Sequence, residues 1–135
     1  MRKWTLMLLL TLLQLAASGQ TARQWRDSLS VLMRQIDQHP GSTDLRLRKA
    51  AVNIELGQWE YAVDEYGRVL QLDADNAAAL YFRAYVYTRQ RQYVLAKTDY
   101  EHLLQTAPLH MKARLGLAVV EEKMGHVREA GDQYN

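Results

Sequence analysis

In segment 77–110 the apolar residues fall into two short runs, and within each run they recur at spacings of three and four. This spacing places the apolar side chains on one side of a helix, so each run predicts an amphipathic helix. A tight turn joins the two runs, and Pro108 follows the second. Segments 43–76 and 111–135 carry the same pattern in the same register. The pattern therefore predicts successive pairs of short antiparallel helices.

A shift of 34 residues aligns small and aromatic residues in columns. The three columns are Ala50, Ala84 and Ala118; Ala62, Ala96 and Ala130; and Tyr66, Tyr100 and Tyr134. Two helices of a hairpin approach closely where one presents a small side chain, and an aromatic residue one turn later fills the wider gap beside it. We therefore expect these alanines to be buried at helix contacts, with the tyrosines packed next to them.

The turn inside each helix pair needs a residue that tolerates positive φ, which suits Gly57 and Gly125. Arg91 occupies this column in the middle repeat, where we expect a looser turn. The helices are expected at 43–56, 58–72, 77–90, 92–106, 111–124 and from 126 onward. Ser42 or Thr43 and Asn76 suit the N-cap positions.

This pattern resembles the tetratricopeptide repeat (TPR), a 34-residue unit with a small–aromatic–small–aromatic–proline signature. The matching residues are Ala50, Gly57, Trp59, Ala62, Tyr66 and Val69; then Leu80, Ala84, Tyr87, Tyr93, Ala96, Tyr100, Leu103 and Pro108; then Leu117, Ala118, Gly125, Ala130 and Tyr134. The sequence departs from the signature at Ala74, Arg46, Arg114, Asn53 and Glu121. The resemblance implies an all-α fold, an α-solenoid of antiparallel helix hairpins over residues 43–135, with repeats 43–76, 77–110 and an incomplete 111–135.

The first residues have the composition of a secretory signal peptide. Arg2 and Lys3 precede a leucine-rich run, and small residues follow at positions 16–19. We expect cleavage between Gly19 and Gln20, with an uncleaved anchor as the alternative, although the run is shorter than the roughly 20 apolar residues that span a bilayer. Export then leads to the periplasm or the cell exterior, with no stable membrane span after cleavage.

Residues 20–42 are expected to cap the solenoid. Between Thr21 and Gln38 the apolar residues Trp25, Leu29, Leu32, Met33 and Ile36 form one helical stripe, and His39-Pro40-Gly41 follows. Solenoid ends need such a cap. At the other end of the chain we expect either a truncated repeat protein or an edge that pairs with another chain.

Charge and chemistry exclude several functions. The net charge is +2, but Arg2 and Lys3 supply this excess, and the remaining 15 basic residues balance 15 acidic ones. Nucleic acid is therefore not an expected partner. The chain has no Cys and no nucleotide-binding or zinc-protease motif, and its four histidines are scattered. We expect no enzyme activity, no cofactor and no metal.

Protein binding is the use we expect, because stacked hairpins form a concave groove lined by the first helix of each repeat. The residues expected to contact a partner are Leu47, Ile54, Tyr81, Tyr85, Arg89, Leu115 and Lys123. Tyr81, Tyr85 and Arg89 form a stripe, and Tyr and Arg are enriched in binding hot spots. The alternative is that the two tyrosines only pack against the neighbouring helix.

The resemblance also bears on the type of ligand. Chaperone-binding TPR proteins hold a C-terminal carboxylate with Lys and Asn in the groove, and the matching places here carry Leu47 and Ala51. An apolar peptide or helix therefore suits this groove better than a charged tail. We consider three hypotheses: an exported adaptor with a protein or peptide partner, a structural protein that self-associates through its C-terminal edge, and the sensing fragment of a larger regulator or enzyme.

Overall fold

The computed structural model describes the backbone of residues 2–133, together with the side chains of Met7 and of residues 21–128. This part of the chain contains helices and no strand. The helices are α1 (Arg2–Gln38), α2 (Thr43–Glu55), α3 (Trp59–Leu72), α4 (Ala77–Arg89), α5 (Tyr93–Thr106) and α6 (Met111–Gln133). The predicted all-α class is confirmed, and α2 to α5 begin and end within one residue of the expected positions.

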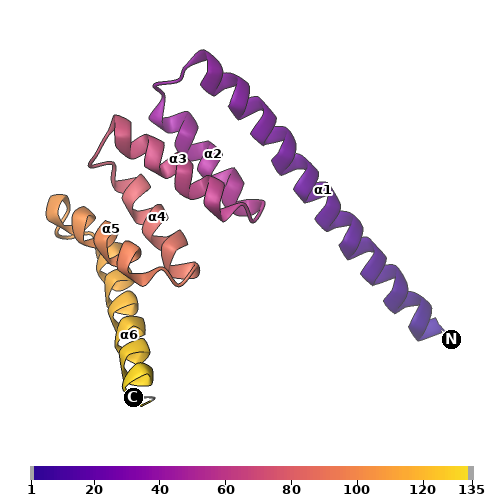
Figure 1. The fold of residues 1–135 in the computed structure, drawn as a ribbon. Helices are drawn as coiled ribbons and strands as arrows, with labels where there is room; N and C mark the ends of the chain where they lie inside the picture. The colour runs from indigo at the N-terminus through magenta and orange to yellow at the C-terminus, as the bar shows by residue number, and fades with distance from the viewer. Residues whose placement is uncertain (1, 134–135) are drawn as a thin grey trace.

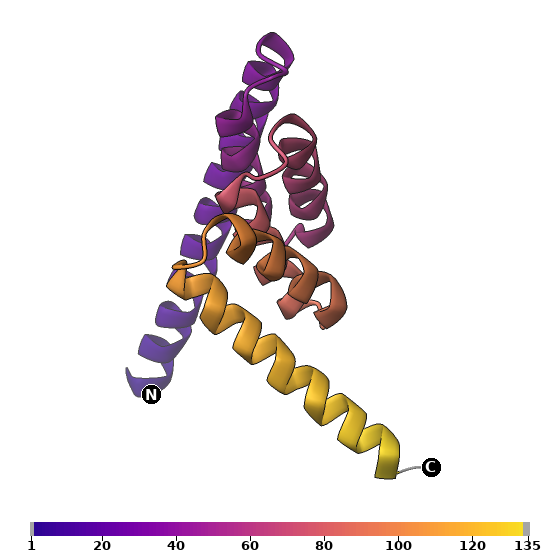
Figure 2. The same ribbon diagram turned by 90° about the vertical axis from the view of Figure 1, so that its left-hand side faces the viewer.

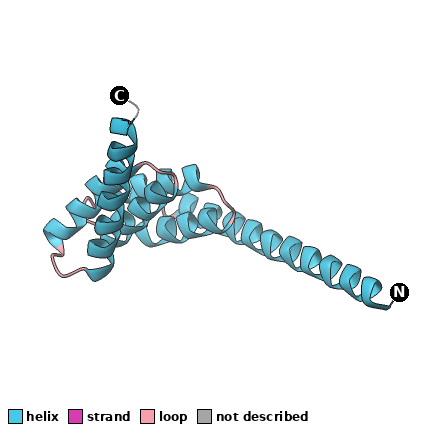
Figure 3. Ribbon diagram, turned by 90° about the horizontal axis from the view of Figure 1, so that it is seen from below, coloured by secondary structure: helices cyan, strands magenta, loops and turns pink. Residues whose placement is uncertain are grey.

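Helices α2 to α6 pack in chain order, each against the next (Figures 1 and 2). The C-terminal part of α1 packs against α2, where Ile36 is buried. The rest of α1 projects away from the array (Figure 3). Along the described chain, no helix has the length and apolar content needed to cross a membrane.

Helix α1 is longer than expected. It ends at Gln38 as predicted, but it begins at Arg2 rather than at Thr21 and runs without a break through the expected cleavage site. The leader at 1–19 and the capping role of 20–42 stay predictions.

Two polar side chains fix the starts of the first helices of the hairpins. Ser42 Oγ accepts a hydrogen bond from the Leu45 amide at 3.3 Å, and Asn76 Oδ1 accepts one from the Ala79 amide at 3.0 Å. Each bond satisfies an amide that has no partner inside its helix. Ser42, rather than Thr43, is the N-cap of α2.

The two hairpin turns have the same geometry although their central residues differ. Gly57 has φ 70° and Arg91 has φ 60°. In each turn the next residue donates its amide to a carbonyl near the end of the preceding helix, Gln58 to Asn53 and Gln92 to Tyr87, both at 2.8 Å. The expected looser turn at Arg91 is wrong. The arginine adopts the conformation that glycine takes more easily, at a steric cost of about 1 kcal/mol.

The predicted helix contacts are confirmed in both hairpins. Ala50 and Ala62 in α2–α3, and Ala84 and Ala96 in α4–α5, have no exposed surface. Their small size lets the two helices of each hairpin approach closely. The tyrosines of the same repeats, Tyr66 and Tyr100, are buried beside them.

An ion pair also ties the two helices of each hairpin together. Lys49 Nζ lies 2.7 Å from Glu65 Oε1, and Arg46 contacts the other oxygen of Glu65 at 3.2 Å. Thirty-four residues later, Arg83 donates two hydrogen bonds to Asp99, at 2.7 and 2.8 Å. Both carboxylates are almost fully buried. The hydrogen bond to Asp99 raises the pKa of the Arg83 guanidinium, so this arginine stays charged.

The third repeat does not form a hairpin. Helix α6 continues from Met111 to Gln133, so the predicted turn at Gly125 is wrong. Ala118 is exposed rather than buried, because no second helix in the described part of the chain covers its face of α6. The side chain of Ala130 and residue Tyr134, which complete the expected columns, lie outside the described residues.

Candidate peptide-binding groove

Helices α2, α4 and α6 line one face of the array, and two adjoining hollows lie on this face. The first hollow has a volume of about 230 Å³. Its lining residues come from α2, α3 and α4: Leu47, Ala51, Ile54, Glu55, Tyr66, Ala78, Phe82 and Tyr85. Glu55 is the one charged residue among them. The first hollow is therefore suited to an apolar side chain with a positive charge beside it.

The second hollow, of about 350 Å³, lies between α4 and α6. Its lining residues are Tyr81, Tyr85, Thr88, Tyr100, Lys112, Leu115, Gly116 and Val119. It too is mainly apolar, with Lys112 as the charged group at its edge. Tyr85 lines both hollows, so the two form one continuous groove across the first helices of the repeats.

Contacting aromatic rings form the wall between the hollows. Phe82 stacks on Tyr66 with centroids 6.3 Å apart and meets the edge of Tyr81 at 5.2 Å. Tyr81 also contacts Tyr100 at 6.1 Å and His110 at 5.7 Å. His110 Nδ1 in turn accepts a hydrogen bond from the Ala113 amide at the start of α6. These contacts hold the aromatic side chains in place before a ligand binds, so fewer side chains become ordered on binding and its entropic cost is smaller.

Gly116 allows α6 to approach this aromatic surface. A β-carbon at position 116 would lie 2.4 Å from Cζ of Tyr100. That distance is far below van der Waals contact, so any larger residue would displace the Tyr100 ring or the helix. The glycine therefore sets the depth of the second hollow.

The buried phenols of the groove stay protonated near neutral pH. Burial raises the pKa of Tyr66 to about 12. Burial also raises the pKa of Tyr100, although a hydrogen bond with Thr88 opposes this shift. Both phenols are therefore neutral and add no charge to the groove.

The structure brings most of the predicted contact residues together. Leu47, Ile54 and Tyr85 line the first hollow, and Tyr81, Tyr85 and Leu115 line the second. Arg89 and Lys123 line neither of these hollows but a third one, whose lining residues are Thr88, Arg89, Arg91, Tyr93, Lys123, His126 and Val127. Tyr81 packs against the rings of Phe82, Tyr100 and His110 and also lines the second hollow. Whether these residues bind a partner stays a prediction.

Sequence reasoning missed Phe82, which is 45% exposed and lies in the first hollow. Its column holds Arg48 and Gly116, so the repeat carried no signal for it. It also missed that Tyr66 and Tyr100 line the groove. Packing inside a hairpin is enough to explain the 34-residue recurrence of these tyrosines, so the spacing gave no sign of a second role.

The described side chains include no group of three His, Cys, Asp or Glu residues that could hold a metal ion. His102 pairs with Asp75 at 2.8 Å, and His110 caps α6, so two of the histidines have structural partners. The groove itself is apolar and aromatic. Its geometry suits binding rather than bond-making chemistry.

Comparisons with known proteins agree with this architecture. The sequence profile of the TPR repeat matches residues 52–90. Rat sperm-associated antigen 1 is 29% identical over 84 residues, which is 62% of this chain and 9% of that protein. The chain thus spans only a small part of this relative.

Solved TPR structures are similar to the chain over most of its length. A tetratricopeptide repeat protein from Parabacteroides merdae has a TM-score of 0.73 at 25% identity, over 78% of this chain and 41% of that one. The first TPR of Spaghetti (RPAP3), bound to the HSP90 peptide SRMEEVD, has a TM-score of 0.72 at 18% identity, over 76% of this chain and 81% of that one. Together with the repeat match, these similarities show that the chain has the fold of a TPR solenoid, a fold typical of protein–protein interaction scaffolds.

Proposed function

We propose that this chain is an exported, non-catalytic scaffold that binds a polypeptide partner in the groove formed by α2, α4 and α6. The observation that carries the proposal is the pair of adjoining apolar hollows that share Tyr85. Tyr85 is 40% exposed and Leu115 is 64% exposed, so both are accessible to a ligand. Exposed apolar residues clustered in a concave surface are typical of binding sites rather than of ordinary surface.

The ligand we propose is a peptide or helix that places apolar side chains in the two hollows. Two RPAP3 domains of similar fold bind an HSP90 peptide and an HSP70 peptide, which supports a polypeptide ligand. Leu47 and Ala51 line the first hollow where chaperone-binding TPR proteins carry Lys and Asn, and neither side chain can donate a hydrogen bond to a terminal carboxylate. An apolar anchor is the better fit there.

Export to the periplasm or the cell exterior is the part of the proposal that rests on the leader at 1–19. Its charged start, leucine-rich run and small residues support it. N-terminal sequencing of the chain recovered from the cell envelope tests it. A mature start at Gln20 supports export with cleavage, whereas an intact Met1 contradicts cleavage and favours the uncleaved anchor.

The groove is tested by selecting peptides from a random library on the wild-type chain and measuring their affinity for variants. Tyr85→Ala removes the residue shared by both hollows, so we expect binding at least tenfold weaker. Tyr61→Ala is the matched control, because Tyr61 is 63% exposed on α3 and lines neither hollow. Circular dichroism should show equal helicity in both. Unchanged affinity in Tyr85→Ala would show that the groove is not the binding site.

Self-association through α6 is a second candidate, because α6 has an uncovered face. Ala118 is exposed although the other two members of its column have no exposed surface. A second copy that covered this face would give a mass that rises with concentration in light scattering. A monomer throughout the concentration series removes this candidate.

A further inference from the structure

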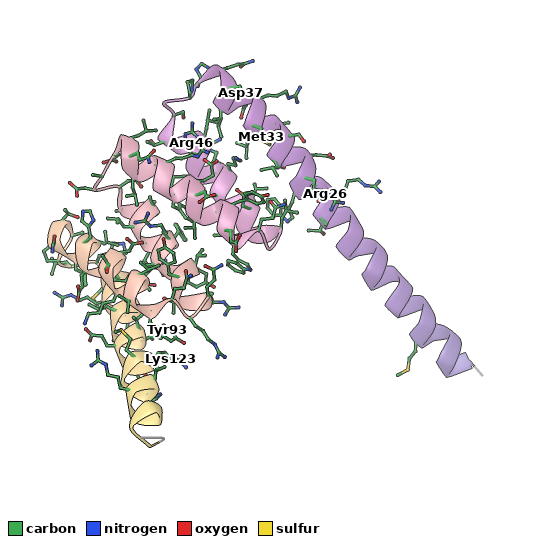
Figure 4. All side chains as sticks on the ribbon, in the orientation of Figure 1. Arg26, Met33, Asp37, Arg46, Tyr93 and Lys123 are labelled. Atoms are coloured by element: carbon green, nitrogen blue, oxygen red, sulfur yellow. The ribbon has the colours of Figure 1, made fainter. Side chains whose placement is uncertain are left out.

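The third hollow differs from the first two in its charge. It has a volume of about 500 Å³ and lies between the C-terminal end of α4, the turn to α5 and the outer half of α6. Figure 4 shows Tyr93 of α5 close to Lys123 of α6 at this place. Arg89, Arg91, Lys123 and His126 contribute three cations and an imidazole to its lining. The described residues that line it include no carboxylate.

Within the described residues, the basic groups of the third hollow also lack a carboxylate partner. Among the described side chains, none of these four forms an ion pair, whereas Lys49, Arg83 and Lys97 each face a carboxylate. A concave surface with charges of one sign raises the local concentration of opposite charge. Guanidinium groups in particular match carboxylate and phosphate oxygens.

Arg91 gives a second reason to assign this hollow a ligand. It holds a left-handed backbone, φ 60°, at the turn where the preceding repeat has Gly57. Glycine would adopt this conformation without steric cost, so the arginine reduces stability. The C-terminal end of α4 attracts a cation at Arg89. That attraction does not account for Lys123 and His126, which come from α6.

The third hollow continues the groove. Thr88 lines both the second and third hollows, and Tyr85 lines both the first and second. A single extended ligand can therefore pass over two apolar hollows and then reach the basic one.

We propose that the third hollow binds anionic side chains of the polypeptide that occupies the groove. This inference rests on the proposed function for the identity of the ligand. The ligand then has a direction: its apolar anchors lie over α2 and α4, and its acidic or phosphorylated residues lie between α4 and α6. Carboxylate and phosphate share the chemistry that the arginines recognise.

The test is an NMR titration of the ¹⁵N-labelled full chain with three tripeptides: triglutamate, a peptide with a central phosphoserine, and triglutamine. We expect saturable shifts of the amides of Arg91, Lys123 and His126 with an anionic tripeptide and none with triglutamine. The anionic tripeptide that binds more tightly shows whether the hollow prefers carboxylate or phosphate. Raising the salt from about 50 to 200 mM should weaken binding severalfold, since screening is stronger. The absence of saturable shifts with both anionic tripeptides, or equal shifts with triglutamine, overturns the inference.

Arg91→Gly separates binding from folding. We expect at least fivefold weaker binding of the anionic tripeptide together with a thermal midpoint raised by about 4 °C, because glycine relieves the left-handed backbone. Arg34→Ala is the control, because it removes one cation from the exposed surface of α1, away from the hollow. Equal weakening in the two variants would mean that net charge alone attracts the tripeptide, and full affinity in Arg91→Gly would also overturn the inference.

These tripeptides carry no apolar anchor, so the result does not depend on the first two hollows. Loss of tripeptide binding would leave the groove function intact, and an unaffected Tyr85→Ala variant would overturn the groove function alone. To link the two sites, peptides selected on the wild-type chain should carry acidic residues on one side of the apolar anchors. Peptides selected on Arg91→Gly should lose this enrichment, and equal enrichment on both proteins contradicts the proposal.

Discussion

The two hairpins, α2–α3 and α4–α5, and the single helix α6 start from the same repeat pattern but fold differently. Each hairpin has a pair of alanines without exposed surface, a buried tyrosine, and a turn residue with positive φ. In the third repeat Gly125 stands at the turn position, yet α6 passes through it as continuous helix. A glycine at the turn position is therefore compatible with a hairpin but does not by itself produce one.

The ion-pair columns differ in the same way. Lys49 and Arg83 on the first helices face Glu65 and Asp99 on the second helices. The third repeat has Leu117 and Gln133 at these positions, so it has neither charge. Burying an unpaired charge is costly, and a buried pair specifies one arrangement of two helices in several known systems. The third repeat lacks this device, and Leu117 packs instead against the core under α6.

The largest effect that separates the two regions should come from enlarging an alanine. Ala96→Leu places a larger side chain at a hairpin contact with no exposed surface, so we expect a loss of about 3 kcal/mol in the free energy of unfolding. Ala118→Leu on the exposed face of α6 should change it by less than about 0.5 kcal/mol. Urea denaturation measures both. A comparable loss in Ala118→Leu would mean that a second helix covers α6 in solution.

Alkaline pH should weaken the hairpins through their buried phenols. Burial raises the pKa of Tyr66 to about 12, compared with its ordinary value of 10.0. Between these values the unfolded chain loses the proton while the folded chain keeps it, so stability falls as pH rises from about 10 to 12. We expect this phenol to account for about 2 kcal/mol of the fall.

Denaturation at pH 9 and at pH 12 measures the effect in Tyr66→Phe, which should lose less stability than the wild type. The stability of Tyr66→Phe should still fall somewhat between the two pH values, because burial also raises the pKa of Tyr87 and Tyr100. Tyr61→Phe, at a position 63% exposed, should behave as the wild type does. An equal loss of stability between pH 9 and pH 12 in all three proteins would mean that Tyr66 is hydrated in solution.

The sequence predicted those parts of the fold that depend on spacing alone. The alanine and tyrosine columns located both hairpins, and the apolar positions on the first helices located most of the groove. Both results follow because a side chain's direction on a helix is determined by its position in the repeat.

What the sequence did not predict depends on contacts between helices. The pairing of Lys49 with Glu65 has the same 34-residue recurrence as the alanines, in Arg83 and Asp99, but only the fold shows that these residues face each other. The exposure of Phe82 and the basic third hollow likewise arise where three helices meet. A turn at Gly125 would form only if the segment after it packed back against the first half of α6. A repeat signature does not show whether that packing is favourable.

The smallest and sharpest comparison uses alanine in place of the two glycines. Gly57 has φ 70° and a β-carbon there would meet no atom within 4 Å, so Gly57→Ala should cost about 1 kcal/mol from backbone strain alone. A β-carbon at Gly125 would also meet no atom within 4 Å, and this glycine is inside α6, so Gly125→Ala should raise stability by about 0.5–1 kcal/mol. The two substitutions are chemically identical, so opposite shifts of the urea midpoint would isolate the local backbone conformation. If Gly125→Ala instead lowered the midpoint as Gly57→Ala does, the third repeat would be a hairpin in solution, and the face of α6 that bears Ala118 would be covered by its own chain rather than open to a second copy.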